Sequence, residues 1–139
     1  MKITPYISVP NAKKTIEVYK NLFGAILSSH MPFNKHIGEE WGFPDDFDYD
    51  NSTMHAVLDF QGSEIYISDS MNPTSSGPVE IVLDFKSREA LENIWAKVKQ
   101  MKLEVVMELE TQFWGALYGR FVDNDGVGWQ LNHNLNDAS

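Results

Sequence analysis

The sequence contains no cysteine among its 139 residues. Disulfide bonds, thiolate zinc sites and a cysteine nucleophile are therefore excluded, and the composition fits a reducing compartment. No stretch approaches the ~18 apolar residues that a membrane helix needs. The first residues do not combine a basic segment with an apolar run, so they predict no secretory signal. We therefore expect a cytoplasmic protein with no membrane partner.

Positive charge is also scarce, because 11 lysines and arginines face 20 aspartates and glutamates, which gives a net charge of −9. Nucleic acid selects basic faces, so the charge argues against a nucleic-acid partner. The hydrophobic fraction is 42% and the aromatic fraction 12%. These values and the length indicate one globular domain over residues 1–139.

The first half of the chain predicts a strand, a helix and three further strands. The helix follows the N-cap candidate Asn11, shows an apolar stripe of period four and ends at Gly24. The strands are predicted at 2–9, 25–31, 53–60 and 63–69. A long loop at 32–52 holds four aromatic residues, which we expect to pack on the core, on a second subunit or on a ligand.

The second half repeats this order after a loop at 70–78. A helix is predicted from the N-cap candidate Ser87 to Met101, and strands at 79–85, 103–108, 112–122 and 127–133. The pattern predicts an α+β fold of two βαβββ modules, at about 1–70 and about 78–135. Their mixed sheets would enclose a small-molecule pocket.

Four segments resemble one protein family. They are TPYISV, YKNLFGA, MHAVLDFQGSEIYISD and the run ETQFWGALYGRFVDNDGVGWQLN at 110–132. Together they resemble the PhnB-like branch of the glyoxalase/bleomycin-resistance/dioxygenase (vicinal oxygen chelate) superfamily. The resemblance implies paired βαβββ modules assembled as a homodimer, with pockets near the module or subunit junction.

The resemblance also implies four positions at which metal-dependent members hold a divalent ion. In this sequence they correspond to Thr4, Tyr66, Glu80 and Gln130. Glu80 is the one normal anionic ligand among them, and this set supplies little charge for a tight site. We therefore predict no cofactor and keep a divalent metal as the alternative.

Two residues are candidates for catalysis, and each has a second interpretation. Glu80 alternates with Val79 and Ile81, so it is either a pocket carboxylate or an exposed residue paired with a lysine or arginine. His55 could act as a general base near neutral pH, although a single histidine on a strand is more often structural.

Aromatic residues gather on the last two predicted strands. Phe113, Trp114, Tyr118 and Trp129 could form a stacking wall for a guest, or they could belong to the core or a dimer contact. We assign Trp114 to the pocket, because Gly115 beside it would leave space, and Trp129 to the core. Gln112 and Arg120 could supply polar contacts, and Arg120 could equally be a surface cation.

The predicted function is the binding of a small aromatic or cationic molecule in a metal-poor pocket. The alternative is a divalent-metal-dependent lyase, isomerase or dioxygenase that uses Glu80 and His55. The predicted ligand-binding residues are Tyr66, Glu80, Gln112, Phe113, Trp114, Tyr118 and Gln130.

Overall fold

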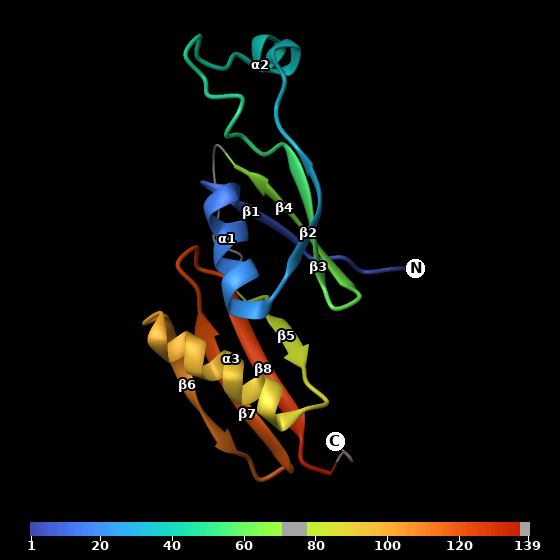
Figure 1. Cartoon of the computed structure of the whole chain (residues 1–139), viewed down its shortest axis with the longest axis vertical. Coiled ribbons are helices and arrows are strands. Elements are labelled where there is room, and N and C mark those ends of the chain that lie inside the picture. The colour runs from blue at the N-terminus through green and yellow to red at the C-terminus, as the bar shows by residue number, and fades with distance from the viewer. Residues whose placement is uncertain (71–77, 137–139) are drawn as a thin grey trace. The chain divides into compact units, whose positions relative to one another are not determined.

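The computed structural model describes residues 1–70 and 78–136, so most of the predicted loop at 70–78 lies outside the described residues. The chain divides into two compact units, Met1–Thr74 and Ser75–Ser139. Each unit contains a four-stranded mixed sheet (Figure 1). In the described residues, no helix combines the length and the apolar character needed to cross a bilayer.

The first unit contains four strands and two helices. Its elements are β1 (Tyr6–Val9), α1 (Ala12–Phe23), β2 (Ile26–Met31), α2 (Lys35–Trp41), β3 (His55–Phe60) and β4 (Ser63–Asp69). The sheet order is β1-β4-β3-β2, in which β1 runs parallel to β4 and the other neighbours are antiparallel. The first strand of the unit therefore pairs with its last strand.

Helix α1 has the caps that the sequence predicts. The Asn11 side chain accepts a hydrogen bond from the backbone N–H of Lys14 at 3.2 Å, and Gly24 ends the helix with a φ of 69°. The buried stripe of the helix includes Ile16, Tyr19 and Leu22. It packs on the sheet face that carries the alternate residues Ile7, Val9, Ala56, Leu58, Ile65 and Ile67, all of them buried.

The second unit contains one helix and four strands. Its elements are β5 (Ile81–Asp84), α3 (Arg88–Gln100), β6 (Glu104–Thr111), β7 (Ala116–Val122) and β8 (Gly128–Asn134). The sheet order is β5-β8-β7-β6, with β5 parallel to β8. This arrangement repeats the first unit, so the two βαβββ modules predicted from the element order are confirmed.

One face of the second sheet packs against α3. Phe121, Trp129 and Leu131 are buried there together with Leu91 and Val98 of the helix. Trp129 also donates from its indole Nε1 to Asp123 at 2.9 Å, which satisfies its polar group inside the core. The assignment of Trp129 to the core is therefore confirmed.

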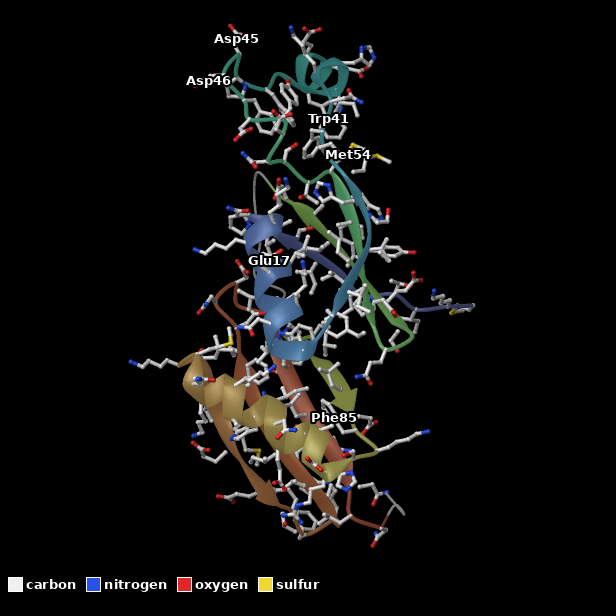
Figure 2. The ribbon with its side chains drawn as sticks, in the orientation of Figure 1. Glu17, Trp41, Asp45, Asp46, Met54 and Phe85 are labelled. Atoms are coloured by element: carbon white, nitrogen blue, oxygen red, sulfur yellow. The ribbon has the colours of Figure 1, made fainter. Side chains whose placement is uncertain are left out.

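The predicted loop at 32–52 was wrong in one respect, because it contains α2. The Asn34 side chain accepts a hydrogen bond from the N–H of Ile37 at 2.8 Å, and Gly42 ends the helix with a φ of 74°. Phe33, Phe43 and Phe47 contact one another around the buried ring of Phe33. These rings therefore pack on their own segment, whose residues Trp41, Asp45 and Asp46 are labelled in Figure 2.

The predicted strand at 112–122 was also wrong at its start. Strand β7 begins at Ala116, and residues 112–115 form the turn of a hairpin between β6 and β7. The N–H of Gln112 donates to the carbonyl of Ala116 at 2.7 Å, and Gly115 has a φ of 86°. Gly115 thus provides a backbone conformation that L-residues disfavour, which is a different role from leaving space for a guest.

Candidate functional site

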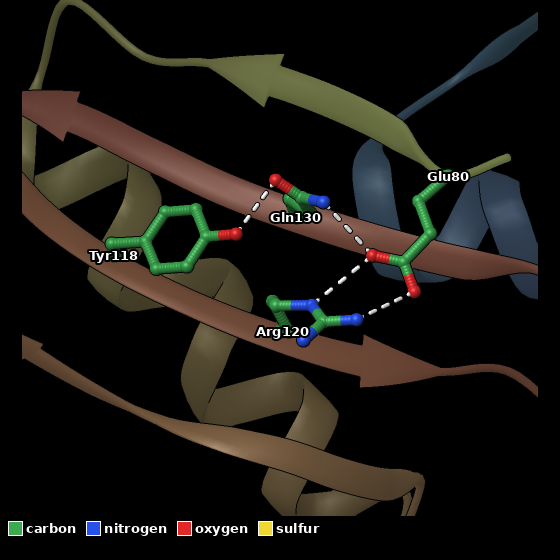
Figure 3. A network of polar contacts seen from close by, with 4 residues as sticks. All are labelled: Glu80, Tyr118, Arg120 and Gln130. Carbon is green, nitrogen blue, oxygen red and sulfur yellow. Dashed lines mark hydrogen bonds and ion pairs between the residues drawn. The ribbon is translucent and has the colours of Figure 1, made fainter. Parts of the chain in front are cut away.

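A polar cluster lies on the face of the second sheet that points away from α3. Tyr118 and Arg120 alternate along β7 with residues of the buried face, Gln130 lies on β8, and Glu80 immediately precedes β5. Figure 3 shows the four side chains converging in front of the sheet. We call this surface the network face and define it by Glu80, Tyr118, Arg120 and Gln130.

Every polar group that joins these side chains has a matched partner. Arg120 donates to Glu80 twice, from Nε to Oε1 at 3.1 Å and from Nη2 to Oε2 at 2.9 Å. The Gln130 amide donates from Nε2 to Glu80 Oε1 at 2.9 Å. The Tyr118 hydroxyl donates to Gln130 Oε1 at 2.7 Å. The donors therefore run in one direction along the chain of contacts and end on the Glu80 carboxylate (Figure 3).

The network fixes the ionisation of the central pair. The hydrogen bonds that Glu80 accepts from Arg120, and next from Gln130, hold the pKa of its carboxyl below the ordinary value. The hydrogen bond to Glu80 raises the pKa of the Arg120 guanidinium. Both groups are therefore charged at neutral pH, and their charges cancel. The arginine partner matches the second interpretation of Glu80, but the residue lies just before β5 and its side chain is 20% exposed, so it is not the exposed strand residue of that interpretation.

Gly128 makes room for the Glu80 side chain. A Cβ atom at position 128 would lie 2.7 Å from Glu80 Oε2 and 2.8 Å from Glu80 Cγ. Carbon atoms do not approach that closely, so the carboxylate reaches Arg120 across a space that glycine leaves open. Reasoning from the sequence missed Gly128. Its place at the start of a predicted strand, two residues after the turn glycine Gly126, was visible in the sequence.

Aromatic rings adjoin the network at one end. The Trp114 ring lies 5.7 Å from the Tyr118 ring at an interplanar angle of 71°, and Phe113 lies 5.0 Å from Trp114. Phe113 is 97% exposed and Trp114 51% exposed, because both lie in the hairpin turn. Gln112 opens the same turn. Trp114 therefore connects through Tyr118 to the network, whereas Phe113 contacts Trp114 at the outer end.

In the first unit, the structure brings two candidate residues together and adds a third. His55 and Tyr66 lie 4.9 Å apart between ring centroids, and the Tyr6 ring contacts both. The Tyr6 hydroxyl and His55 Nδ1 are 3.3 Å apart. Thr4 precedes β1, and it is Tyr6 that pairs with Tyr66 in the register of the parallel strands. Reasoning from the sequence missed Tyr6, whose alternation with Ile7 could have revealed it.

The remaining strand histidines have local partners. His30 Nε2 lies 2.9 Å from the hydroxyl of Thr53, and burial lowers the pKa of this histidine. His133 Nδ1 lies 2.9 Å from the carbonyl oxygen of Phe85. Both rings are therefore held by hydrogen bonds to residues next to strands, Thr53 before β3 and Phe85 after β5.

The donor set around Glu80 does not fit a divalent ion as it is arranged. Both Glu80 oxygens accept hydrogen bonds from Arg120, and Gln130 Oε1 accepts one from Tyr118. An ion at Glu80 would sit beside a guanidinium, which repels it. Across residues 1–70 and 78–136, no three histidine, aspartate or glutamate side chains form a group that could hold a metal.

Comparison with known proteins gives one family and several relatives. The family model for the Glyoxalase/Bleomycin resistance protein/Dioxygenase superfamily matches residues 3–131. Protein YjdN of Escherichia coli K12 is 27% identical over 141 residues, with 95% of each chain covered. These matches extend over both units.

Solved structures share the fold. PA1353 from Pseudomonas aeruginosa is 25% identical with a TM-score of 0.76, and the alignment covers 96% of this chain and 98% of that one. The PhnB protein from Bacillus cereus is 19% identical with a TM-score of 0.71, and the alignment covers 96% of this chain and 99% of that one. The arrangement of strands and helices is therefore common to proteins of very different sequence.

Proposed function

Because the chain belongs to the Glyoxalase/Bleomycin resistance protein/Dioxygenase superfamily, we propose that it binds a small aromatic molecule on the network face. The observation that carries this proposal is the unbroken chain of contacts that starts at the Trp114 ring and runs through Tyr118, Gln130 and Glu80 to Arg120. A guest lying along it would meet aromatic rings at one end and fixed hydrogen-bonding groups at the other.

The aromatic end supports a planar guest. Tyr118 is half-buried and holds its ring against Trp114 while its hydroxyl is committed to Gln130. A ring that is already fixed loses little freedom when a guest stacks on it. Each aromatic contact adds about 1 kcal/mol beyond the area that it buries.

The polar end supports a neutral guest better than a cation. A cationic guest needs a free carboxylate, but Glu80 is already matched by Arg120 at 2.9 Å. A cationic ligand, the other kind of guest that the sequence predicts, would have to displace that arginine. The aromatic ligand requires no rearrangement of the pair.

A thermal-shift screen tests the proposed function. A panel of aromatic metabolites and drugs should contain members that raise the melting temperature, because a ligand at 100 times its dissociation constant stabilises the folded state by about 2.7 kcal/mol. Trp114→Ala should weaken this stabilisation. Trp41→Ala is the matched control, because Trp41 is an exposed indole of the other unit. A panel with no stabilising member, or equal effects in Trp114→Ala and wild type, would contradict the proposal.

A metal-dependent enzyme is the second candidate. Glu80 and Gln130 are two of the four positions implied by the resemblance, and Gln130 Nε2 lies 2.9 Å from Glu80 Oε1. That proximity favours the candidate, but Arg120 would have to release Glu80 before either residue could bind an ion. The binding function requires no such change, so we prefer it.

The proposal includes a homodimer. Large apolar side chains are exposed on β2, one of the two outer strands of the first sheet, and they include Ile26 and Met31. An outer strand with exposed apolar side chains is typical of a surface that a second chain covers.

A further inference from the structure

We propose that Glu80 determines the charge of the ligand: by neutralising Arg120, it makes the network face select uncharged aromatic molecules that carry a carbonyl-type acceptor over aromatic anions. This inference rests on the proposed function of the same face. It concerns the specificity of the site and gives Glu80 a role other than that of a metal ligand.

Arg120 retains donors for a guest. A guanidinium has five N–H groups, and Arg120 uses one on Nε and one on Nη2 for Glu80. Five minus two leaves three, and Glu80 is the sole hydrogen-bond partner of this guanidinium among the described residues. The Arg120 side chain is 34% exposed, so these donors are accessible to a carbonyl oxygen. Because Glu80 fixes the guanidinium plane, the direction of the donors is also fixed.

The charges on this face disfavour an anion. Asp84 accepts a hydrogen bond from Asn132, which pairs with Tyr118 across the β7–β8 ladder, so Asp84 shares the network face. Glu110 pairs with Tyr118 across the β6–β7 ladder and lies on the same face. The network face therefore carries three carboxylates: Glu80 contacts the Arg120 guanidinium, whereas Asp84 and Glu110 lie beside Tyr118, two positions away along β7. An incoming carboxylate would meet Glu80 on the arginine and two further negative charges on the same face.

An uncharged acceptor avoids this repulsion. A carbonyl oxygen can accept the remaining N–H groups of Arg120 without bringing a further charge to the face. Removing the charge of Glu80 would leave the Arg120 charge without its partner, and the preference would then move toward anions. The prediction concerns the ratio of two affinities, which a general loss of folding stability does not shift.

The test uses a matched pair of probes, 2-naphthamide and 2-naphthoate, which share one aromatic body and differ in charge. Ligands of this size bind at about 1 mM, so titration by NMR of the Trp114 indole and the Arg120 Nε–H is the suitable measurement. Wild-type protein should bind the amide roughly tenfold more tightly than the carboxylate, a difference of about 1.4 kcal/mol. In Glu80→Gln the affinity ratio should move toward the carboxylate by roughly tenfold.

Asp84→Asn provides the matched control, because it removes a carboxylate from the same face without contacting Arg120. Its affinity ratio should change by less than about threefold, since exposed charges are screened. The double variant Glu80→Gln/Arg120→Gln should lose the gain in carboxylate affinity. Thermal melts establish that each variant is folded.

The outcomes separate this inference from the proposed function. An unchanged ratio in Glu80→Gln, with both probes still dependent on Trp114, would overturn the inference and leave the binding function intact. An equal shift in Asp84→Asn would overturn it as well, because the general charge of the face would then be responsible. Failure of both probes to bind wild type would also overturn it. The binding function itself falls if the ligand panel contains no binder, or if its binders stabilise Trp114→Ala as much as wild type.

Discussion

The Glu80 carboxylate reaches Arg120 because residue 128 has no side chain. Both residues were candidates in the sequence: alternation placed Glu80 opposite an apolar face, and Arg120 was named as a possible polar contact or a surface cation. Their pairing was not predictable, because it depends on the register of β5 against β8 and of β8 against β7. One residue of slippage would have turned these side chains to the helix side.

Gly128→Ala should break the network while leaving the core in place. The added methyl group would overlap Glu80 Cγ and Oε2, so the carboxylate must move away from Arg120. The side chain is flexible, so we expect a loss of about 1 kcal/mol in the free energy of unfolding, measured by urea denaturation. Gly126→Ala cannot serve as the control for this variant, because Gly126 has a φ of 84° and an alanine there would strain the backbone.

The Arg120 Nε–H resonance gives the direct measurement for this variant. It should move in Gly128→Ala and also in Glu80→Gln, because the first change displaces the carboxylate that accepts from Arg120 Nε and the second replaces it with an uncharged amide. An unperturbed resonance in Gly128→Ala would contradict the role assigned to Gly128.

The depressed pKa of Glu80 predicts a pH-dependent contribution to stability. Its carboxyl has an ordinary value of 4.5 in the unfolded chain and a lower value when folded. The unfolded state therefore binds the proton first, so the stabilisation is complete above 4.5 and is lost as the pH falls through the folded pKa.

Denaturation of wild type and Glu80→Gln between about pH 7 and about pH 3 measures this contribution. The wild type should be more stable by about 1 kcal/mol at neutral pH, and the difference should shrink in acid. A difference that stays constant down to the acid end would mean that Glu80 is not held by Arg120 in solution.

At the scale of the element, the sequence predicted the long periodic segments well and the short ones poorly. Helix α1 and helix α3 have clear apolar stripes and polar N-caps, and both were found. Helix α2 has seven residues with Gly38 in its middle, and glycine usually interrupts a helix. The turn at 112–115 was predicted as part of a strand, and its aromatic residues Phe113 and Trp114 are of types enriched in strands.

Position 38 of α2 requires glycine because the Tyr49 ring lies against the helix there. A Cβ atom at position 38 would come within 2.7 Å of Tyr49 Cζ and 2.8 Å of Cε1 and would overlap the hydroxyl. Alanine favours a helix over glycine by about 1 kcal/mol, but overpacking costs about 1–3 kcal/mol, so Gly38→Ala should destabilise the protein.

Chemical denaturation measures this effect, and the double variant Gly38→Ala/Tyr49→Ala is its control. Removing the ring should turn the alanine substitution from destabilising to neutral or stabilising relative to Tyr49→Ala alone. A destabilisation that persists without the ring would show that the contact is not responsible.

At the scale of the whole molecule, element order and the family resemblance predicted two βαβββ modules, and both are present. The expectation that their sheets enclose a pocket remains a prediction, because sequence patterns report which face of a strand is apolar and not how two sheets meet. The four positions implied for a metal likewise show that the sequence does not predict which side chains contact one another. The mapping implied by the resemblance selected Glu80, just before β5, and Gln130 on β8, which contact each other, but it did not include Arg120 of β7, which also contacts Glu80.

Elemental analysis of the purified protein distinguishes the proposed ligand-binding function from the metal-dependent enzyme. Because Arg120 engages both Glu80 oxygens, we expect the metal content to be well below one ion per chain and equal in wild type and Glu80→Gln. A stoichiometric divalent metal that is lost in Glu80→Gln would favour the metal-dependent enzyme instead.

Light scattering after size-exclusion chromatography tests the homodimer. We expect a mass of twice the 15.9 kDa of one chain. The double variant Ile26→Asp/Met31→Asp should lower it toward one chain if the exposed side chains of β2 form the contact. A monomer at all concentrations would exclude the dimer.

The pairing of first with last strand in each unit has a consequence for synthesis on the ribosome. Tyr6 pairs with Tyr66, which is synthesised 60 residues later, since 66 minus 6 is 60. At about 5–20 residues per second, the first strand has no partner for about 3–12 seconds after it is made. During that interval its backbone can bond to a neighbouring nascent chain, so slow translation before residue 66 should increase co-translational aggregation.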